Sequence, residues 1–471
     1  MKQTKIIATL GPASSEPNMI KQLISAGVDI FRINFSHGSR EVQQENITRI
    51  RETAADIGKV VGIMGDLQGP KIRIAKFAEG KILLKPGQPF ILDCAYKELG
   101  NESIVGVDYA ALASDVIPGD ILLLDDGKIA LNVEKVQGDK VYTKVVQAGV
   151  LSNNKGINKQ GGGLTAPALT TKDFADIEFA CRMSLDYIAV SFVRDATDIA
   201  LTRTLIATHS GTASIIAKIE RVEAINNMDE ITKACDGIMV ARGDLAVEVG
   251  DACVPGLQKR MIKTARKNNK LTIVATQMLE SMIKSPVATR AEVSDIANAV
   301  LDGTDAVMLS AETASGDYPV AAVSVMARTC IEAEKNREFS FDMDLSGQKF
   351  DYIDQAVAMS TLFSAYHLQA KAIIALTTSG ATALWLSRFN IGIPIYAMTN
   401  LTKSAQQMAL YNNVHPILVN TQAKNTTDLR IEAKTILLNS KLIEKGDTIL
   451  LTCGDHLHEI GGTNTMKIEM W

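Results

Sequence analysis

The stretch from Ser214 to Asp244 decides the fold. It reads SIIAKIE over 214–220 and, after an interval with helical character, DGIMVARGD over 236–244. Because side chains alternate along a strand, Lys218 and Glu220 point to the same side. Mg²⁺ prefers hard oxygen ligands and takes few of them from protein. Glu220 and Asp244 with one ammonium group therefore indicate a site for a divalent cation and an anionic substrate. A set of surface ion pairs at strand ends is the alternative.

Apolar runs of this kind recur along the chain with helical intervals between them. They cover residues 5–10, 28–33, 60–66, 186–192, 214–220, 236–240, 272–275 and 305–310. Continuous apolar runs are typical of parallel strands that are buried on both faces. About eight β/α units predict a (β/α)8 TIM barrel, an α/β fold whose active site lies at the C-terminal ends of the strands. A doubly wound open sheet is the competing fold.

Polar and charged residues follow the ends of nearly all these runs. They are Thr9 to Pro12, Arg32, Asn34, Ser36, His37, Asp66, Lys218, Glu220, Gly243, Asp244, Thr276, Gln277, Ser310 and Glu312. In a barrel the strand ends converge on one mouth, so we expect these residues to line a single site.

Length and composition limit the class of protein. The chain has 471 residues, which exceeds what one hydrophobic core supports, so two or three domains are expected. A formal net charge of −4 without basic blocks argues against a nucleic-acid binder. The first residues, Met1 to Leu10, are expected to form a strand rather than a signal peptide, and no run reaches membrane-spanning length. Six scattered cysteines fit a reducing cytoplasm.

Two further units interrupt and follow the barrel pattern. Shorter, alternating runs with turn signals, including the hairpin around Gln137-Gly138-Asp139, predict a small β-barrel lid inserted over residues 71–167. Gly161-Gly162-Gly163 is a candidate hinge, with a plain flexible loop as the alternative. The barrel is expected over 1–70 and 168–340.

A separate α/β domain is predicted over 346–471. Its first helix should present Ala356, Met359, Phe363 and Tyr366 on one face, and strands are expected over 372–377, 393–399, 417–420 and 448–453. The loop after its first strand could offer backbone N–H groups to a phosphate, with ordinary helix capping as the alternative. The loop residues in question are Thr377, Thr378, Ser379, Gly380 and Thr382.

Several long motifs in order resemble pyruvate kinase. They are RINFSHG (32–38), DLQGPKIR (66–73), IAKIER (216–221), MVARGDL (239–245), ATQMLESM (275–282) and AVMLSAET (306–313). The resemblance covers essentially the whole chain, and DLQGPKIR with SNNKGIN (152–158) looks most like the bacterial type II branch. It implies a barrel, a lid and a C-terminal effector domain with no further domain, usually assembled as a homotetramer. It also implies transfer of the phosphoryl group of phosphoenolpyruvate to ADP, giving pyruvate and ATP.

The resemblance assigns roles residue by residue. The substrate and catalytic set is Arg32, Lys218, Gly243, Asp244, Thr276 and Ser310, with Glu220 and Asp244 as ligands of Mg²⁺ or Mn²⁺. The nucleotide set is Pro12, Asn34, Phe35, Ser36, His37, Arg73 and Lys155. Whether Thr276 or a water chain past Ser310 and Glu312 protonates the enolate is left open.

The resemblance also bears on potassium and on the effector. The family K⁺ site matches Asn34, Ser36, Asp66 and the carbonyl of Leu67, but potassium-dependent members carry a glutamate at the position of Lys71. We expect Lys71 to replace K⁺, which is then not required. The loop over 453–462 lacks the tryptophan and arginine that clamp a second phosphate, so a sugar monophosphate or AMP is expected as activator.

Two rival functions share part of this pattern. A metal-dependent lyase or mutase that forms an enolate on a similar barrel would share the lysine and carboxylates but would not need a nucleotide lid. A catalytically inactive sensor of phosphoenolpyruvate would be expected to lack some of the residues Arg32, Lys218, Glu220, Asp244 and Thr276, and all of them are present.

Overall fold

The computed structural model describes residues 1–336, 350–389, 391–419, 426–455 and 461–471. Eight parallel strands close into a barrel in the order β1-β16-β15-β14-β13-β12-β3-β2. They are β1 (Lys5–Thr9), β2 (Ile30–Asn34), β3 (Gly62–Asp66), β12 (Tyr187–Val190), β13 (Ser214–Ile219), β14 (Gly237–Ala241), β15 (Leu271–Ala275) and β16 (Ala306–Leu309). The predicted barrel is confirmed, and the open sheet is excluded.

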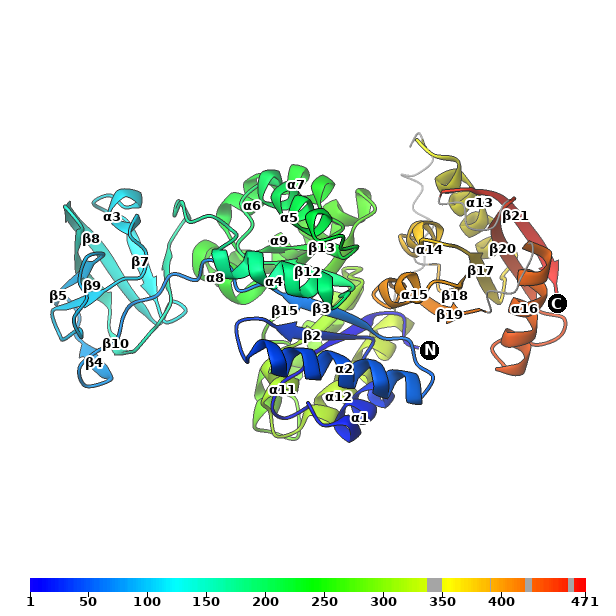
Figure 1. Cartoon of the computed structure of the whole chain (residues 1–471), viewed down its shortest axis with the longest axis horizontal. Helices are drawn as coiled ribbons and strands as arrows, with labels where there is room; N and C mark the ends of the chain where they lie inside the picture. Colours follow the sequence, from blue (N-terminus) through cyan, green and yellow to red (C-terminus); the bar gives the residue numbers. More distant parts are fainter. Residues whose placement is uncertain (337–349, 390, 420–425, 456–460) are drawn as a thin grey trace.

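Helices alternate with these strands and cover the outside of the barrel (Figure 1). They are α1 (Pro17–Ala26), α2 (Arg40–Asp56), α4 (Thr171–Arg182), α5 (Ala196–Thr208), α6 (Val222–Asn226), α7 (Met228–Ala234), α8 (Arg242–Val249), α9 (Val254–Lys267), α10 (Arg290–Leu301), α11 (Ala311–Ala314) and α12 (Pro319–Lys335). Capping boxes start two of them, at Thr170 with Asp173 and at Thr289 with Glu292.

The strand alternation determines which side chains reach the barrel interior. In β13, Ile215, Ala217 and Ile219 belong to the cluster packed against the outer helices, whereas Ile216 belongs to the inner cluster. Because the period is two, Lys218 and Glu220 continue the inner row beyond Ile216. The same rule places Asp66 after Met64 of β3 on the inner side. The mouth of the barrel is therefore lined by the charged ends of otherwise apolar rows.

The inserted unit, here called the lid, has its own hydrophobic core. Its elements are β4 (Lys81–Leu84), β5 (Pro89–Asp93), β6 (Ile104–Gly106), α3 (Leu112–Asp115), β7 (Ile121–Leu124), β8 (Ile129–Gln137), β9 (Lys140–Gln147), β10 (Gly149–Ser152) and β11 (Ile157–Lys159). Six strands form one sheet, β11-β7-β8-β9-β5-β6, and β10 pairs with β4. The expected β8–β9 hairpin is confirmed, with Gln137 paired to Lys140.

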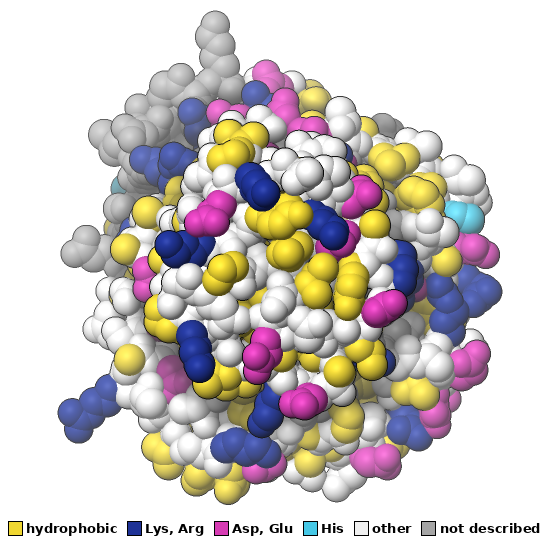
Figure 2. All heavy atoms as spheres, turned by 90° about the vertical axis from the view of Figure 1, so that its left-hand side faces the viewer, with side chains coloured by type: hydrophobic (Ala, Val, Ile, Leu, Met, Phe, Trp, Pro, Cys, Tyr) yellow, Lys and Arg dark blue, Asp and Glu magenta, His cyan; other side chains and the backbone are white. Residues whose placement is uncertain are grey.

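The lid lies at one end of the molecule and joins the barrel through two neighbouring chain segments (Figure 1). Viewed from that end, basic and acidic side chains are interspersed with hydrophobic ones (Figure 2). On the described part of this face, no block of one charge dominates.

The C-terminal unit packs at the opposite end of the barrel (Figure 1). Its elements are α13 (Ile353–His367), β17 (Ala372–Leu376), α14 (Ala381–Ser387), β18 (Ile395–Thr399), α15 (Thr402–Met408), β19 (Val414–Leu418), α16 (Thr426–Asn439), β20 (Thr448–Gly454) and β21 (Thr463–Met470). The sheet order is β19-β18-β17-β20-β21, with β21 antiparallel to β20. The buried Arg388–Asp305 ion pair fastens this unit to the start of β16.

Three details of this unit differ from the expectations. The strand expected over 417–420 begins earlier, at Val414, and Asn420 lies outside the described residues. Strand β21 was not predicted, because its alternating sequence follows a segment with few strand signals. In α13 the expected face is right for Met359, which is buried, and wrong for Phe363 and Tyr366, which are exposed; Ala358, Leu362 and Ala365 are the other apolar residues packed in the core.

None of the helices in the described part of the chain is long and apolar enough to cross a membrane.

Candidate active site

Four charged side chains form a continuous network inside the barrel mouth. Arg32 Nε lies 2.6 Å from Asp66 Oδ2, and Lys218 Nζ lies 3.3 Å from Asp66 Oδ1. Lys218 also lies 2.9 Å from Glu220 Oε1. The side chains of Asp66 and Glu220 are 1% and 2% exposed, so the pairs are shielded from solvent. The mouth therefore presents two fixed cations to an anionic ligand.

The charges of this network stabilise one another. Burial alone would lower the pKa of Lys218, but Asp66 and Glu220 outweigh it and raise the pKa above its ordinary value. Burial would raise the pKa of Asp66, but Arg32 and Lys218 lower it overall. Burial raises the pKa of Glu220, and the carboxylate of Asp244 raises it further against the opposing effect of Lys218. A cation between Glu220 and Asp244 would relieve their repulsion.

The second half of the site comes from the ends of β14 and β15. Helix α8 starts at Arg242, and the backbone N–H of Gly243 donates to Thr276 Oγ1 at 2.9 Å. Thr276 itself has φ 72°, which is an unfavourable region for a β-branched residue. The guanidinium of Arg242 donates to the Thr276 carbonyl at 2.7 Å and holds this conformation. Gly243, Asp244 and Gln277 line a cleft of about 690 Å³ shared with the lid.

Ser310 and Glu312 follow the end of β16, with Ser310 capping α11 and Glu312 in its first turn. Glu312 Oε2 accepts from the Ser310 backbone N–H at 2.7 Å, and its other oxygen accepts from Leu279 N–H at 3.1 Å. Glu312 is 1% exposed. Both carboxylate oxygens are thus engaged with the backbone, so Glu312 positions two loops of the mouth.

Comparison with known proteins identifies the family. The family model described as pyruvate kinase, barrel domain, matches residues 1–323, and the model described as pyruvate kinase, alpha/beta domain, matches residues 355–469. The chain belongs to the pyruvate kinase family. Among its relatives, pyruvate kinase II of Salmonella typhimurium is 48% identical over 99% of this chain and 98% of its own length. A pyruvate kinase of Buchnera aphidicola subsp. Schizaphis graminum is 47% identical over 99% and 98%.

A solved structure gives the same result. The crystal structure of a pyruvate kinase from Cryptosporidium parvum matches with a TM-score of 0.94 at 35% identity, covering 100% of this chain and 96% of that one. As a pyruvate kinase, the protein is a phosphotransferase that converts phosphoenolpyruvate and ADP into pyruvate and ATP. Family members generally depend on a divalent metal.

The residues expected at the nucleotide fall into two groups in the structure. On the barrel, Pro12, Ser36 and His37 are exposed at the mouth, and Asn34 Oδ1 accepts from the Ser36 backbone at 3.1 Å. Phe35 differs, because its side chain is 1% exposed and packs edge-to-face on Phe179. Only the backbone of Phe35 faces the mouth, where its carbonyl accepts from Lys172.

The second group lies on the lid. Arg73 Nη1 donates to the Asn154 carbonyl at 2.9 Å, and Lys155 Nζ pairs with Asp125 at 2.7 Å. Within the described residues no hydrogen bond or ion pair joins Arg73 or Lys155 to the barrel group. Lys71, at the lid junction, lies 3.4 Å from Asp244 Oδ1, so it pairs with an expected metal ligand rather than with Asn34, Ser36 or Asp66.

The expected effector loop lies on the C-terminal unit, far along the chain from the mouth. Thr377 Oγ1 accepts from the Gly380 backbone at 3.0 Å, and Thr382 is buried with its hydroxyl 2.7 Å from that of Thr463. The loop over 453–462, expected to lack a clamp for a second phosphate, includes residues 456–460, which lie outside the described residues.

Sequence reasoning missed two residues of the mouth. Ser191 Oγ accepts from Lys218 Nζ at 2.7 Å and donates to the Leu67 carbonyl at 2.7 Å. The backbone N–H of Phe192 donates to Glu220 Oε2 at 2.7 Å. The signal for Ser191 was present: it continues the inner row of Tyr187 and Ala189 in β12. The role of Phe192 depends on its φ of 54°, which the sequence does not reveal.

Proposed function

We propose that Lys218 and Arg32 carry out the electrostatic part of phosphoryl transfer. The observation behind this proposal is the inward-facing ammonium of Lys218, held by Asp66, Glu220 and Ser191. As the bond from phosphorus to the enol oxygen breaks and a bond to the ADP β-phosphate forms, negative charge moves onto the enolate oxygen. Lys218 stabilises this charge, and Arg32, oriented by Asp66 and Thr9, binds the phosphoryl group.

Glu220 and Asp244 are the proposed holders of Mg²⁺ or Mn²⁺, which would supply positive charge to the phosphoryl and enolate oxygens. Two carboxylates suit a cation that keeps several ligands from water and substrate. In the described residues no group of three or more His, Cys, Asp or Glu side chains forms a protein-only metal cage. The pKa of Glu220 is raised by burial and by the neighbouring charge of Asp244, which supports a cation bound between the two carboxylates.

Gly243, Asp244 and Thr276 are the proposed binding residues for the substrate carboxylate and methylene group. The backbone N–H of Gly243 donates to the hydroxyl of Thr276 at 2.9 Å, so these two groups lie side by side at the mouth. Protonation of the enolate carbon by Thr276 or through water near Ser310 remains a choice between two routes. Because Glu312 is engaged with the backbone through both oxygens, it serves to position Ser310 rather than to donate a proton.

On the nucleotide side, we propose that Pro12, Asn34, Ser36, His37 and the backbone of Phe35 bind ADP on the barrel, while Arg73 and Lys155 reach it from the lid. The exposure of Pro12, Ser36 and His37 at the mouth supports this arrangement. The enzyme is further proposed to work without K⁺, with the ammonium of Lys71 supplying a fixed positive charge near the mouth from its place beside Asp244 rather than from the K⁺ ligands themselves.

Regulation and assembly are inferred from the resemblance. A sugar monophosphate or AMP is the proposed activator at Thr377 to Thr382, and a homotetramer is the proposed assembly.

The test of the central proposal is Lys218→Met. Removing one donor that stabilises the transition state is expected to lower phosphoryl transfer by roughly 10²–10³-fold. Pyruvate formation is measured in a coupled assay, and exchange of the pyruvate methyl protons is measured in parallel because it does not require transfer. A variant that retains near-normal transfer would refute the role of Lys218.

A further inference from the structure

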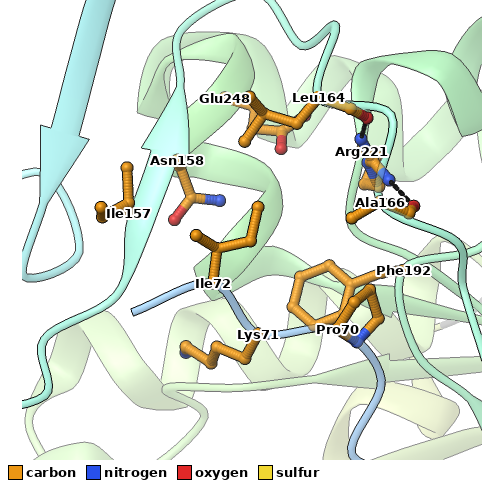
Figure 3. A pocket seen from close by; sticks show the side chains of 10 residues that line it. All are labelled: Pro70, Lys71, Ile72, Ile157, Asn158, Leu164, Ala166, Phe192, Arg221 and Glu248. Carbon is orange, nitrogen blue, oxygen red and sulfur yellow. Dashed lines mark hydrogen bonds between the residues drawn. The ribbon is translucent and has the colours of Figure 1, made fainter. Parts of the chain in front are cut away.

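The lid is joined to the barrel by two chain segments that run close together. The outgoing segment covers residues 69–72, and the return segment covers residues 161–166. Figure 3 shows Pro70, Lys71 and Ile72 of the first and Leu164 and Ala166 of the second around a small pocket of about 20 Å³. Any swing of the lid relative to the barrel passes through these two segments.

The return segment is held by arginines through its backbone. Arg221 Nη2 donates to the Leu164 carbonyl and Nη1 to the Ala166 carbonyl, the latter at 3.4 Å (Figure 3). The carbonyl between them, at Thr165, accepts from Arg194 Nη1 at 3.2 Å. Arg221 is 4% exposed, so its guanidinium is committed to this task rather than to solvent. Three consecutive carbonyls of the return segment are thus bound by barrel side chains.

The glycines of the return segment are held as well. Glu223 Oε1 accepts from the Gly163 backbone at 2.6 Å, and its other oxygen pairs with Arg221 Nε at 3.4 Å. Gly162 has φ 78°, and a Cβ there would come within 3.0 Å of Glu223 Oε1. The absence of a Cβ at Gly162 therefore does more than permit bending, because it lets the return segment pack closely against Glu223 of the barrel.

Glu248 completes this contact from helix α8. Its carbonyl accepts from the Gly161 backbone at 3.0 Å, and its carboxylate accepts from Val222 N–H at 3.0 Å. Burial raises the pKa of Glu248 to about 7. The carboxyl group is therefore partly protonated near neutral pH.

The outgoing segment is connected to the end of β13 through Phe192. Gly69 has φ 65°, and a Cβ there would meet the Phe192 ring at 2.8 Å. Phe192 in turn donates its backbone N–H to Glu220 Oε2 at 2.7 Å. Arg221 is the residue directly after Glu220. The outgoing segment is therefore linked to Glu220 through Phe192, which is hydrogen-bonded to it. The return segment is linked through Arg221, which follows Glu220 in the chain.

We propose that Arg221 is a positioning residue that anchors the return segment of the lid to the strand end carrying Glu220, so that lid position and the orientation of the Glu220 carboxylate are coupled. The inference rests on the proposed function in one respect, namely that the lid brings Arg73 and Lys155 to ADP. It adds a residue that contacts neither substrate but sets how the lid is held over them.

The test compares Arg221→Lys with the parent. Lysine keeps the positive charge beside Glu220 but cannot bind two carbonyls and Glu223 at once, because only the guanidinium is a rigid fork of donors. Gly162→Ala is the second variant, since it disturbs the contact with Glu223 without changing Arg221. Arg203→Met is the matched control, because Arg203 also binds a backbone carbonyl and a carboxylate, Ala234 and Asp236, but away from the lid.

Amide hydrogen exchange over residues 161–168 is followed by mass spectrometry, and the KM values for ADP and phosphoenolpyruvate are measured. In both variants, exchange is expected to speed up by roughly 10-fold, the factor for losing one hydrogen bond from a charged donor. The KM for ADP should rise by a similar factor and more than the KM for phosphoenolpyruvate, whereas the control should resemble the parent.

Two results would overturn the proposal. If Arg221→Lys matches the parent in both measurements, only the charge of Arg221 matters and the anchor does not exist. If exchange accelerates while both KM values stay unchanged, the segment is held but not coupled to the site. Hydrogen exchange needs no turnover, so a failure of the residue roles proposed above would not affect that readout.

Discussion

Replacing Lys71 by glutamate is expected to make the enzyme depend on potassium. Lys71 Nζ lies 3.4 Å from Asp244 Oδ1, where the Coulomb attraction is about 5 kcal/mol at an effective dielectric of about 20. The two side chains are 31% and 26% exposed, so solvent screens the pair and leaves a net ~1 kcal/mol. Reversing the charge replaces this attraction by a repulsion of similar size. The change of about 2 kcal/mol corresponds to roughly 30-fold in rate.

The assay couples pyruvate formation to oxidation of NADH by lactate dehydrogenase, in tetramethylammonium buffer free of sodium, with and without added K⁺. The parent should respond little to K⁺. Lys71→Glu should lose roughly 30-fold of its rate without K⁺ and regain most of it when K⁺ supplies the missing charge. Lys76→Glu, an exposed position on the same segment, is the control and should behave as the parent does. Many-fold stimulation of the parent by K⁺, or a Lys71→Glu variant indifferent to K⁺, would refute the reasoning.

Three further outcomes are expected. Glu220→Gln should raise the Mg²⁺ concentration needed for half-maximal activity by at least about 10-fold, the factor for one lost charged interaction. The melting temperature should change little, because Lys218 keeps Asp66 as its ion-pair partner; overlapping metal titrations would show that Glu220 is structural. Arg388→Met leaves Asp305 buried without its ion-pair partner, so chemical denaturation should show a loss of about 3–5 kcal/mol in the free energy of unfolding. Lys284→Met removes an exposed ion pair and should lower it by less than ~1 kcal/mol. Equal losses in the two variants would contradict this expectation. If Thr377 to Thr382 bind one phosphate, AMP or a sugar monophosphate should lower the half-saturating phosphoenolpyruvate concentration; activation by fructose 1,6-bisphosphate alone would contradict this.

The barrel and the core of its site could be predicted from sequence because both follow from strand periodicity. A run such as SIIAKIE fixes which residues face inward, and the closed parallel sheet then brings Lys218, Glu220 and Asp66 together. The residue roles came from the resemblance and remain proposals. What the periodicity supplied was the position of the charged side chains, not their chemistry.

Other contacts depend on geometry that the sequence does not encode locally. The pairing of Lys71 with Asp244 depends on how the lid is placed, which is a property of the two connecting segments. The hydrogen bond from Phe192 to Glu220 needs a left-handed backbone at a bulky residue, which local preferences disfavour. In α13, apolar residues lie on both the buried and the exposed face, so hydrophobic spacing alone placed Met359 correctly but not Phe363 and Tyr366.

The hydrophobic clusters indicate which structural units of this chain could be exchanged between relatives and which could not. The lid encloses its apolar residues in a cluster of its own, so it could be exchanged for another β unit by cutting at its two connections. The interior row of the barrel, including Ile30, Tyr187 and Ala306, belongs to one cluster with Leu386 and Met408 of the C-terminal unit. Removing residues 350–471 would open the floor of the barrel to water. For recombination between relatives, the barrel and C-terminal unit should therefore be inherited together.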